Sequence, residues 1–209
     1  MDDIVAEHES KRKSEFDTLQ AQINPHFLYN TLDIIVWMIE NENLTDAVRV
    51  VTALARFFRI SLSRGKSIIT VRDELEHVRN YLMIQHMRYK NKFTYTVEAE
   101  DEVLDLASLK LVLQPLVENA VRHGVSKKAG GGKVTIRTTE TGDAFMVTVC
   151  DDGVGFDPDR IPQSRHMPVG IENVRNRLWN MCGGTLAVRG IPGAGVSAVI
   201  TLPKEGAAS

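Results

Sequence analysis

The sequence predicts an α+β protein in which an N-terminal helical hairpin is followed by a domain of mixed helices and strands. Residues 5–41 contain no glycine, and their apolar side chains recur every three or four positions, which is typical of a helix. After Gly65 the pattern changes to alternating helix and strand signals, which indicates a second domain. A chain of 209 residues is long enough for two modest domains. We therefore place the boundary near Lys66, with residues 1–66 in the hairpin and residues 67–209 in the second domain.

The hairpin begins with one long predicted helix over residues 5–41, with a bend immediately before His26. The bend is expected because the preceding residue is proline, which lacks a backbone N–H and clashes with the previous turn. Asn43 or Thr45 then offers an N-cap for a second helix over residues 46–63. The two helices form an antiparallel pair.

Apolar residues on the first helix spread to two sides beyond the proline. They are Phe27, Leu28, Leu32, Ile34, Ile35, Trp37, Met38 and Ile39. One partner helix cannot cover so wide a face. We therefore expect two copies of the hairpin to pair as a four-helix bundle, which makes the protein a homodimer.

The second domain is predicted to contain three helices and five strands. Helices are expected over residues 71–90, 108–124 and 170–181, and strands over residues 93–97, 133–139, 145–150, 185–189 and 196–202. In the helix at 108–124, the side chains expected to point inward are Leu109, Val112, Leu113, Leu116 and Val117.

Composition excludes several classes of protein. Lys and Arg number 25 against 27 Asp and Glu, so the chain lacks the positive excess typical of nucleic-acid binding, and we expect no nucleic-acid partner. Two cysteines are too few for a disulfide framework. The longest apolar run, residues 34–39, is far shorter than the ~20 residues of a membrane span, and no secretory signal is present. We expect the chain itself to be soluble and cytoplasmic.

His26 belongs to a polar stripe on the first helix. Gln22 and Asn30 lie one turn before and one turn after it, and Asp33 continues the stripe. A lone histidine on an apolar helix is most often structural, but the proline and the nearby amide favour a functional role. A neutral imidazole is a competent nucleophile near pH 7, and we expect the Asn30 amide to orient its ring.

A second polar cluster lies in the helix at 108–124. Glu118, Asn119, Arg122 and His123 place a carboxylate, an amide, a guanidinium and an imidazole within two turns. Because Mg²⁺ prefers oxygen ligands and retains several waters, the amide oxygen of Asn119 together with phosphates makes a suitable site. Arg122 and His123 then suit phosphate oxygens.

A glycine-rich segment follows the strand at 145–150. Asp151 at the strand end can accept a hydrogen bond from an exocyclic amine, and Gly153 and Gly155 allow a ligand to approach the backbone closely. Taken alone, this Asp-x-Gly-x-Gly pattern is more often a simple turn.

The start of the last helix offers a third candidate site. Gly170, Ile171 and Asn173 lie in its first turn, where free amides and the helix dipole favour an anion. Residues 157–169 before it contain three prolines and little periodicity, which suggests a mobile lid.

Taken in order, these three motifs resemble the N, G1 and G2 boxes of the Bergerat-type (GHKL) ATP-binding fold. Residues 19–32 contain His-Phe-Leu-x-Asn and resemble the phosphoacceptor segment of sensor histidine kinases of the LytS/YesM-like subfamily. The resemblance extends from about residue 19 to residue 203. It implies a two-component kinase core with a four-helix bundle and an α/β sandwich that binds ATP and Mg²⁺.

The resemblance also assigns roles to individual residues. It implies that His26 accepts the γ-phosphoryl group, that Asn119 binds Mg²⁺, and that Glu118 polarises or accepts a proton. Asp151 would recognise the adenine amine. Arg122 and His123 match positions that face phosphates, and the nucleotide-binding set is completed by Gly153, Gly155, Gly170, Ile171 and Asn173. Many relatives carry an acidic base directly after the phosphoacceptor, whereas this chain has Phe27, so the base stays open.

The resemblance further implies a partner, which is the receiver domain of a response regulator that takes the phosphoryl group on an aspartate. Relatives carry a membrane sensor region ahead of the hairpin, so the chain is expected to be the cytoplasmic portion of a membrane receptor. Two alternatives stay open: an ATP-binding signalling scaffold with little kinase activity, and an ATPase that forms no stable phosphoprotein.

Overall fold

The computed structural model describes residues 25–62, 67–90, 92–156 and 169–204. The chain divides into two compact units, Met1–Ser63 and Arg64–Ser209. The part of the first predicted helix before residue 25, and with it the bend before His26, lies outside the described residues. So does nearly all of the predicted lid.

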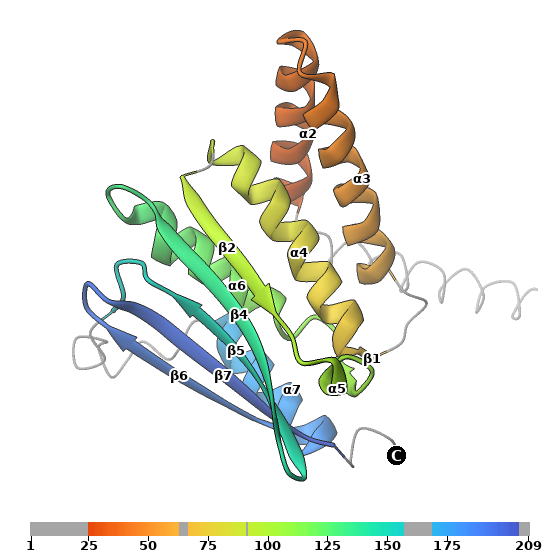
Figure 1. Ribbon diagram of the computed structural model, residues 1–209, viewed down its shortest axis with the longest axis vertical. Coiled ribbons are helices and arrows are strands. Elements are labelled where there is room, and N and C mark those ends of the chain that lie inside the picture. The colour runs from red at the N-terminus through yellow and green to blue at the C-terminus, as the bar shows by residue number, and fades with distance from the viewer. Residues whose placement is uncertain (1–24, 63–66, 91, 157–168, 205–209) are drawn as a thin grey trace, which may run out of the picture. The chain divides into compact units, whose positions relative to one another are not determined.

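The first unit is a helical hairpin made of α2 (Pro25–Glu40) and α3 (Leu44–Ser61) (Figure 1). The two helices bury Phe27 and Phe57 between them, with ring centroids 5.0 Å apart. The other buried apolar side chains of the pair are Ile35, Met38, Ala47, Val50, Ala53, Leu54 and Ile60. The predicted pair of helices is therefore confirmed, and its core lies along one side of each helix.

A second apolar face of the hairpin is exposed. It consists of Tyr29, Leu32, Val36 and Ile39 in α2 and Leu44, Val48 and Val51 in α3. These side chains recur at intervals of three and four residues, the spacing of a helix–helix seam. Among the described residues of this unit, 25–62, no element covers the face, which matches the wide apolar surface expected from the sequence.

Five strands of the second unit form one sheet in the order β2-β4-β5-β7-β6. They are β2 (Phe93–Glu98), β4 (Gly132–Thr141), β5 (Ala144–Asp151), β6 (Thr185–Ile191) and β7 (Gly195–Pro203). β2 pairs parallel with β4, whereas all other neighbours pair antiparallel. All five predicted strands are confirmed. Each forms from a segment in which apolar and polar residues alternate.

Helices cover one face of this sheet (Figure 1). α4 (Val71–Arg88) packs against β2, α6 (Gln114–Asn119) packs against α4 and α7, and α7 (Val169–Cys182) packs against β6 and β7. Side chains such as Ile136, Val147 and Ile200 are buried beneath them. This arrangement is a two-layer α/β sandwich, as predicted.

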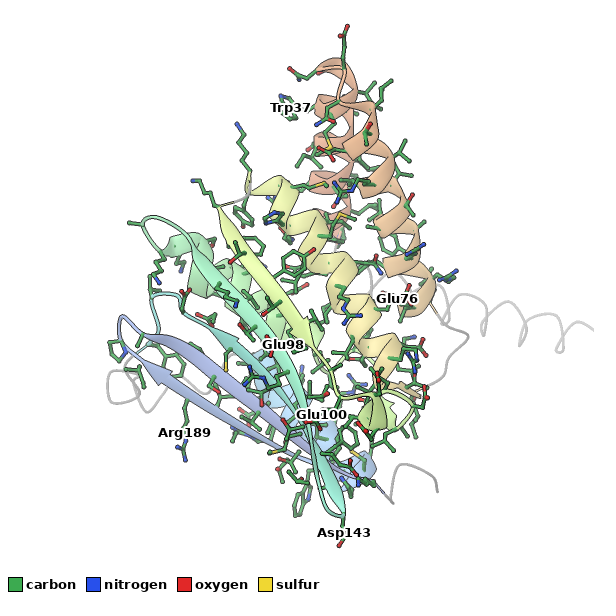
Figure 2. The ribbon with its side chains drawn as sticks, viewed as in Figure 1. Trp37, Glu76, Glu98, Glu100, Asp143 and Arg189 are labelled. Carbon is green, nitrogen blue, oxygen red and sulfur yellow. The ribbon has the colours of Figure 1, made fainter. Side chains whose placement is uncertain are left out.

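The opposite face of the sheet is more polar. Glu98 on β2 and Arg137 on β4 form an exposed ion pair there, with Nη2 and Oε2 2.8 Å apart. Arg189 on β6 is also exposed (Figure 2). Because surface pairs of this kind stabilise little, the free energy of folding comes mainly from the face that the helices cover.

The helix predicted over residues 108–124 is wrong in its first part. Residues Ala107–Leu109 form a short strand, β3, which pairs antiparallel with β1 (Ile68–Thr70). Leu111 has a φ of 60°, a left-handed conformation that a continuous helix does not allow. The five side chains expected to point inward are nevertheless all buried. The short strands and α5 (Asp101–Leu104) were not predicted.

None of the helices in the described parts of the chain is long and apolar enough to cross a membrane.

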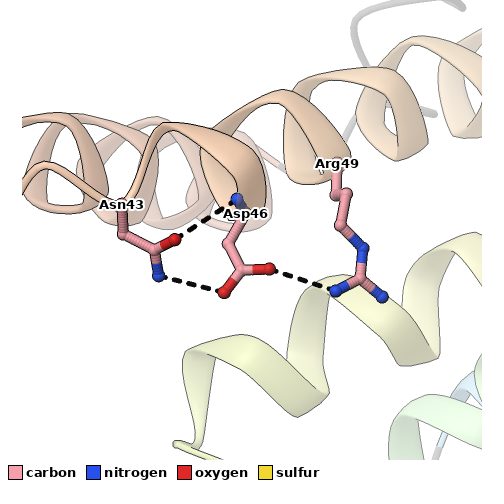
Figure 3. Close-up of polar contacts among 3 residues, drawn as sticks. All are labelled: Asn43, Asp46 and Arg49. Atoms are coloured by element: carbon pink, nitrogen blue, oxygen red, sulfur yellow. Dashed lines mark hydrogen bonds and ion pairs between the residues drawn. The ribbon is translucent and has the colours of Figure 1, made fainter.

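Asn43 caps the start of α3, where the sequence offered two candidates (Figure 3). Its side-chain oxygen accepts the Asp46 N–H at 3.4 Å, and its Nδ2 donates to the Asp46 carboxylate at 2.9 Å. Arg49 holds the same carboxylate at 3.1 Å. The hydrogen bond from Asn43, together with Arg49, holds the pKa of Asp46 below its ordinary value.

We expect Asn43→Ala to lower the free energy of unfolding by about 1 kcal/mol, because the first turn of α3 loses its side-chain acceptor. Urea titration followed by circular dichroism measures this change. Asn43→Ser is the matched control, since serine retains an acceptor and should cost only a few tenths of a kcal/mol. An equal loss in both variants would contradict a capping role.

Candidate functional site

His26 lies in the first turn of α2, with its side chain exposed to solvent. Asn30 and Asp33 share its face of the helix, as predicted, and Gln22 lies outside the described residues. The face continues to Trp37, whose side chain is 50% exposed (Figure 2). This stripe is separate from both the buried face of α2 and its exposed apolar face. The imidazole is therefore accessible to a reactant.

Asn30 differs from expectation in what it contacts. Its Nδ2 donates to the main-chain carbonyl of His26 at 2.5 Å. A side chain bonded to a carbonyl one turn earlier supports the local backbone of the helix. In this structure Asn30 thus acts on the helix around His26 and not on the ring.

The polar cluster of the second unit lies on α6 and on a π-helical turn, η1 (Ala120–Gly124), which follows it directly. Pro115 occupies the first turn of α6, where a missing N–H costs nothing. Gln114 donates to the Glu118 carboxylate at 3.0 Å and so fixes its position. Asn119 is the last residue before the π turn. π turns within helices are often found at functional sites, and this one was not predicted.

Arg122 and His123 lie on the π turn and are exposed. Burial, and after it the positive charges of Lys127 and Arg122, lowers the pKa of His123 below its ordinary value. The positive charges of Arg122 and Lys127 therefore make protonation of His123 unfavourable in free energy. The turn is therefore suited to an anion, which removes that cost.

Asp151 ends β5 and is 8% exposed. Its Oδ1 accepts the Gly153 N–H at 2.9 Å. Burial raises the pKa of Asp151 to about 6, because the hydrogen bond from Gly153 offsets only part of the lost hydration, and the neighbouring Asp152 raises it further. A buried carboxylate with unused acceptor capacity can recognise an N–H donor of a ligand.

Gly124, at the end of the π turn, is a site residue that the sequence reasoning missed. A Cβ at Gly124 would lie 2.4 Å from Oδ1 of Asp151, and one at Gly153 would lie 2.3 Å from the carbonyl carbon of Gly124. The two backbones therefore touch, and neither position tolerates a side chain. The available signal was a glycine five residues after Asn119, at the point where the predicted helix ended.

Asp152 has a different role from its neighbour. It is exposed, and it accepts the Lys133 N–H at 2.6 Å and pairs with the Lys128 ammonium at 3.2 Å. Burial would raise its pKa, but these two contacts hold it below the ordinary value. Asp152 thus ties the start of β4 to the glycine-rich segment.

The remaining predicted residues lie at the ends of the undescribed segment. Gly155 has a φ of 62°, and a Cβ there would lie 1.9 Å from the Ile191 carbonyl oxygen. Gly170 lies in the first turn of α7, where a Cβ would be 3.9 Å from Cβ of Pro115. Ile171 is buried and Asn173 is exposed.

The segment formed by α6 and η1 connects the three motifs of the second unit. The first turn of α7 lies beside its start at Pro115, and the Asp151–Gly153 turn lies beside its end at Gly124. The structure therefore brings the three motifs together along one helical segment. His26 and Asn30 belong to the other unit.

The residue of this cluster that suits a Mg²⁺ ion is Asn119, as the sequence predicts. Among the residues that the structure describes, no group of three or more His, Cys, Asp or Glu side chains could hold a metal. Mg²⁺ commonly takes only one or two protein oxygens and completes its shell with phosphates and water. The amide oxygen of Asn119 fits such a site.

Comparisons with known proteins identify relatives of both units. Residues 14–93 match the family described as histidine kinase. Residues 104–206 match the family described as histidine kinase-, DNA gyrase B- and HSP90-like ATPase.

Curated relatives include the sensor histidine kinase YesM of Bacillus subtilis, which is 32% identical over 92% of this chain and 34% of its own length. The protein YwpD of the same organism is 32% identical over 93% of this chain and 72% of its own length. The chain thus spans about a third of YesM.

Solved structures with a similar fold include the histidine kinase domain of the blue-light activated kinase EL346 from Erythrobacter litoralis. It has a TM-score of 0.54 and 22% identity, over 93% of this chain and 95% of that one. The histidine kinase ThkA in complex with the response regulator protein TrrA has a TM-score of 0.51 and 17% identity, over 93% of this chain and 64% of that one.

We expect Asp151→Asn to become more stable relative to the unsubstituted protein as the pH rises from 5 to 8. The folded-state pKa of Asp151 is raised, so the folded state binds more protons than the unfolded chain between about pH 4 and 6. The stability that this protonation provides is lost as the pH rises through about 6, and asparagine does not titrate.

Urea unfolding at both pH values measures the difference. Asp143→Asn, in the exposed β4–β5 turn (Figure 2), is the matched control and should show no such pH dependence. If the stability difference between Asp151→Asn and the unsubstituted protein were the same at both pH values, burial of an ionised Asp151 would be excluded.

Proposed function

Because the chain belongs to the histidine kinase family, we propose that it is the kinase core of a two-component sensor, which uses ATP to phosphorylate His26. One observation carries this proposal: an exposed histidine on a helical hairpin accompanies a domain in which three nucleotide-binding motifs meet along α6 and η1. A nucleotide-binding domain alone needs no such histidine.

In this proposal Asp151 recognises the base of ATP. At pH 7.5 a carboxyl group with a pKa of about 6 is mostly ionised, so it accepts a hydrogen bond from the adenine amine. The contact between Gly124 and Gly153 holds the turn that carries Asp151 against the end of η1. Gly155, with its left-handed backbone, continues the wall of the base site.

The phosphates would lie toward Arg122 and His123 of η1 and the first turn of α7. Arg122 and His123 would donate hydrogen bonds to phosphate oxygens. The backbone amides of the first turn of α7, at Gly170 and Ile171, would bind the same negatively charged phosphates, with Asn173 beside them. The amide oxygen of Asn119 would hold Mg²⁺, which, when bound, neutralises charge on the transferred phosphoryl group. Most of the catalysis then comes from positioning.

His26 would act as the nucleophile. One ring nitrogen forms a bond to the γ-phosphorus while the bond from that phosphorus to the bridging oxygen breaks, which releases ADP. The proton on the other ring nitrogen must then leave. Glu118, held by Gln114, is the proposed acceptor in the second unit, since the residue after His26 is a phenylalanine.

The proposed partner is the receiver domain of a response regulator, which takes the phosphoryl group on an aspartate. The solved complex of ThkA with TrrA supports this class of partner. Attachment to a membrane through a sensor region of a longer receptor stays a prediction.

We also propose that the kinase core is a homodimer. The exposed apolar face of the hairpin, with its spacing of three and four residues on both helices, fits a second copy of itself in a four-helix bundle. His26 would then stay accessible, because its stripe lies on another side of α2.

Incubation with γ-labelled ATP and Mg²⁺ tests the kinase proposal. We expect an acid-labile, alkali-stable label on the unsubstituted protein, and its complete loss in His26→Gln, because only the proposed nucleophile is removed. His8→Gln is the matched control and should keep the label. Binding of ATP without label in any of the three proteins would favour the scaffold, and steady phosphate release without label would favour an ATPase.

Light scattering coupled to gel filtration tests the dimer. Val48→Asp should shift the protein to a monomer, because it places a charge in the centre of the proposed seam. Thr45→Asp is the control, since it adds the same charge to the first turn of α3, away from the seam, where the helix dipole favours it. A dimer that withstands Val48→Asp would exclude this face as the interface.

A further inference from the structure

Glu74 is a fully buried carboxylate on α4, with 0% exposure, and the proposed mechanism does not use it. One oxygen accepts the Leu111 N–H, and the other accepts the N–H groups of Val112 and Leu113 at 3.2 Å each. Among the described residues only Asp151 is a second buried carboxylate. A buried charge is costly unless it is fully hydrogen-bonded, and here three consecutive amides provide the bonds.

The segment that Glu74 holds leads directly into α6. Leu111 has a left-handed backbone, which a branched residue adopts only when its surroundings impose it. Leu113 is the N-cap residue of α6 and makes no side-chain cap. The Glu74 carboxylate therefore supplies from another helix the acceptor and the negative charge that a helix start favours.

The same segment is tied to α7. Arg177 donates through Nη2 to the Lys110 carbonyl oxygen at 2.7 Å. The charges of Arg177 and of Lys110, which is 7% exposed, both act on Glu74. Residues 110–113 are thus held by α4 on one side and by α7 on the other, and α6 and α7 carry the motifs proposed to bind phosphates.

We infer that Glu74 is a positioning residue for nucleotide binding, which fixes residues 111–113 so that α6 presents Asn119 beside the first turn of α7. This inference rests on the proposed function, because it concerns the same nucleotide site. Glu74 touches backbone amides and no reacting atom, so it acts only through α6.

If Glu74 positions the nucleotide site, the affinity for ATP should depend on whether Glu74 is ionised. A residue that only stabilises the fold would not give this pH dependence of affinity. Burial raises the pKa of Glu74 to about 7, although the three amides and the Arg177 charge lower it in part. The charged groups that face it are Lys110 and Arg177. His77, one turn along α4, is neutral because burial and the Lys110 charge lower its pKa to about 3. Protonation replaces an acceptor by a donor, which breaks the contact with at least one amide.

Calorimetric titration of the whole chain with ATP and Mg²⁺ at pH 6, 7 and 8 is the test. The ionised fraction of Glu74 rises from about a tenth at pH 6 to about nine tenths at pH 8, so affinity should rise about tenfold beyond any change shared with other groups. Glu74→Gln should bind about tenfold more weakly at pH 8 and should lose this pH-dependent part. The titration of Asp151 and of ATP itself contributes equally to both proteins.

Glu98→Gln is the matched control, because it removes a carboxylate from an exposed ion pair on the far face of the sheet. It should leave both the affinity and its pH dependence unchanged. Equal affinity and equal pH dependence in Glu74→Gln and the unsubstituted protein would overturn the inference while leaving the proposed function intact. Absence of ATP binding by the unsubstituted protein would overturn both.

Arg177→Gln provides a second test that does not depend on Glu74→Gln being folded. Removal of a positive charge near Glu74 favours its protonated form, so the pH midpoint of ATP affinity should move upward. A midpoint that stays in place or moves downward in a folded Arg177→Gln protein would contradict the role of Glu74.

Discussion

The contact between the Gly124 backbone and the Asp151 turn is the constraint on which the second unit depends. It joins the end of the helical segment formed by α6 and η1 to the end of the central strand β5. Because no atom separates the two backbones, the distance between the N-box helix and the glycine-rich turn is fixed by van der Waals contact. The other features of the site lie along α6 and η1, whose end at Gly124 is fixed by this contact. They include Glu118, which accepts a hydrogen bond from Gln114, and the first turn of α7 beside Pro115.

Two buried carboxylates serve this arrangement, and both accept hydrogen bonds from backbone amides. Asp151 accepts one from Gly153, and Glu74 accepts three from residues 111–113. In each case burial raises the pKa well above the ordinary value, so the folded domain carries these charges at a cost near neutral pH. Removal of either carboxylate would leave backbone amides without their acceptor, which is itself costly, so both charges are retained as rigid acceptors.

Most of the fold was predictable because it follows local patterns. The five strands alternate with period two, α3 begins at the capping residue Asn43, and α7 ends directly before Gly183. The error at residues 108–113 has a physical cause: its apolar spacing fits a helix, but Glu74, more than thirty residues earlier, stabilises a left-handed turn there. The three nucleotide motifs were recognisable as short segments. The roles of Gly124 and Glu74 were not, because they depend on contacts between distant parts of the chain.

The parallel pairing of β2 with β4 has a consequence for how the domain assembles. Phe93 pairs with Gly132, so closing this ladder brings together residues 39 positions apart, and all of α5, β3, α6 and η1 lie in the loop that is closed. Closing so long a loop costs entropy before any contact compensates for it, which makes the step slow compared with the formation of the β4–β5 hairpin. Because α6 and η1 precede β4 and β5 in the chain, the helix that carries Asn119 leaves the ribosome before these strands. This helix acquires its final surroundings only when β5 and the Asp151 turn have followed.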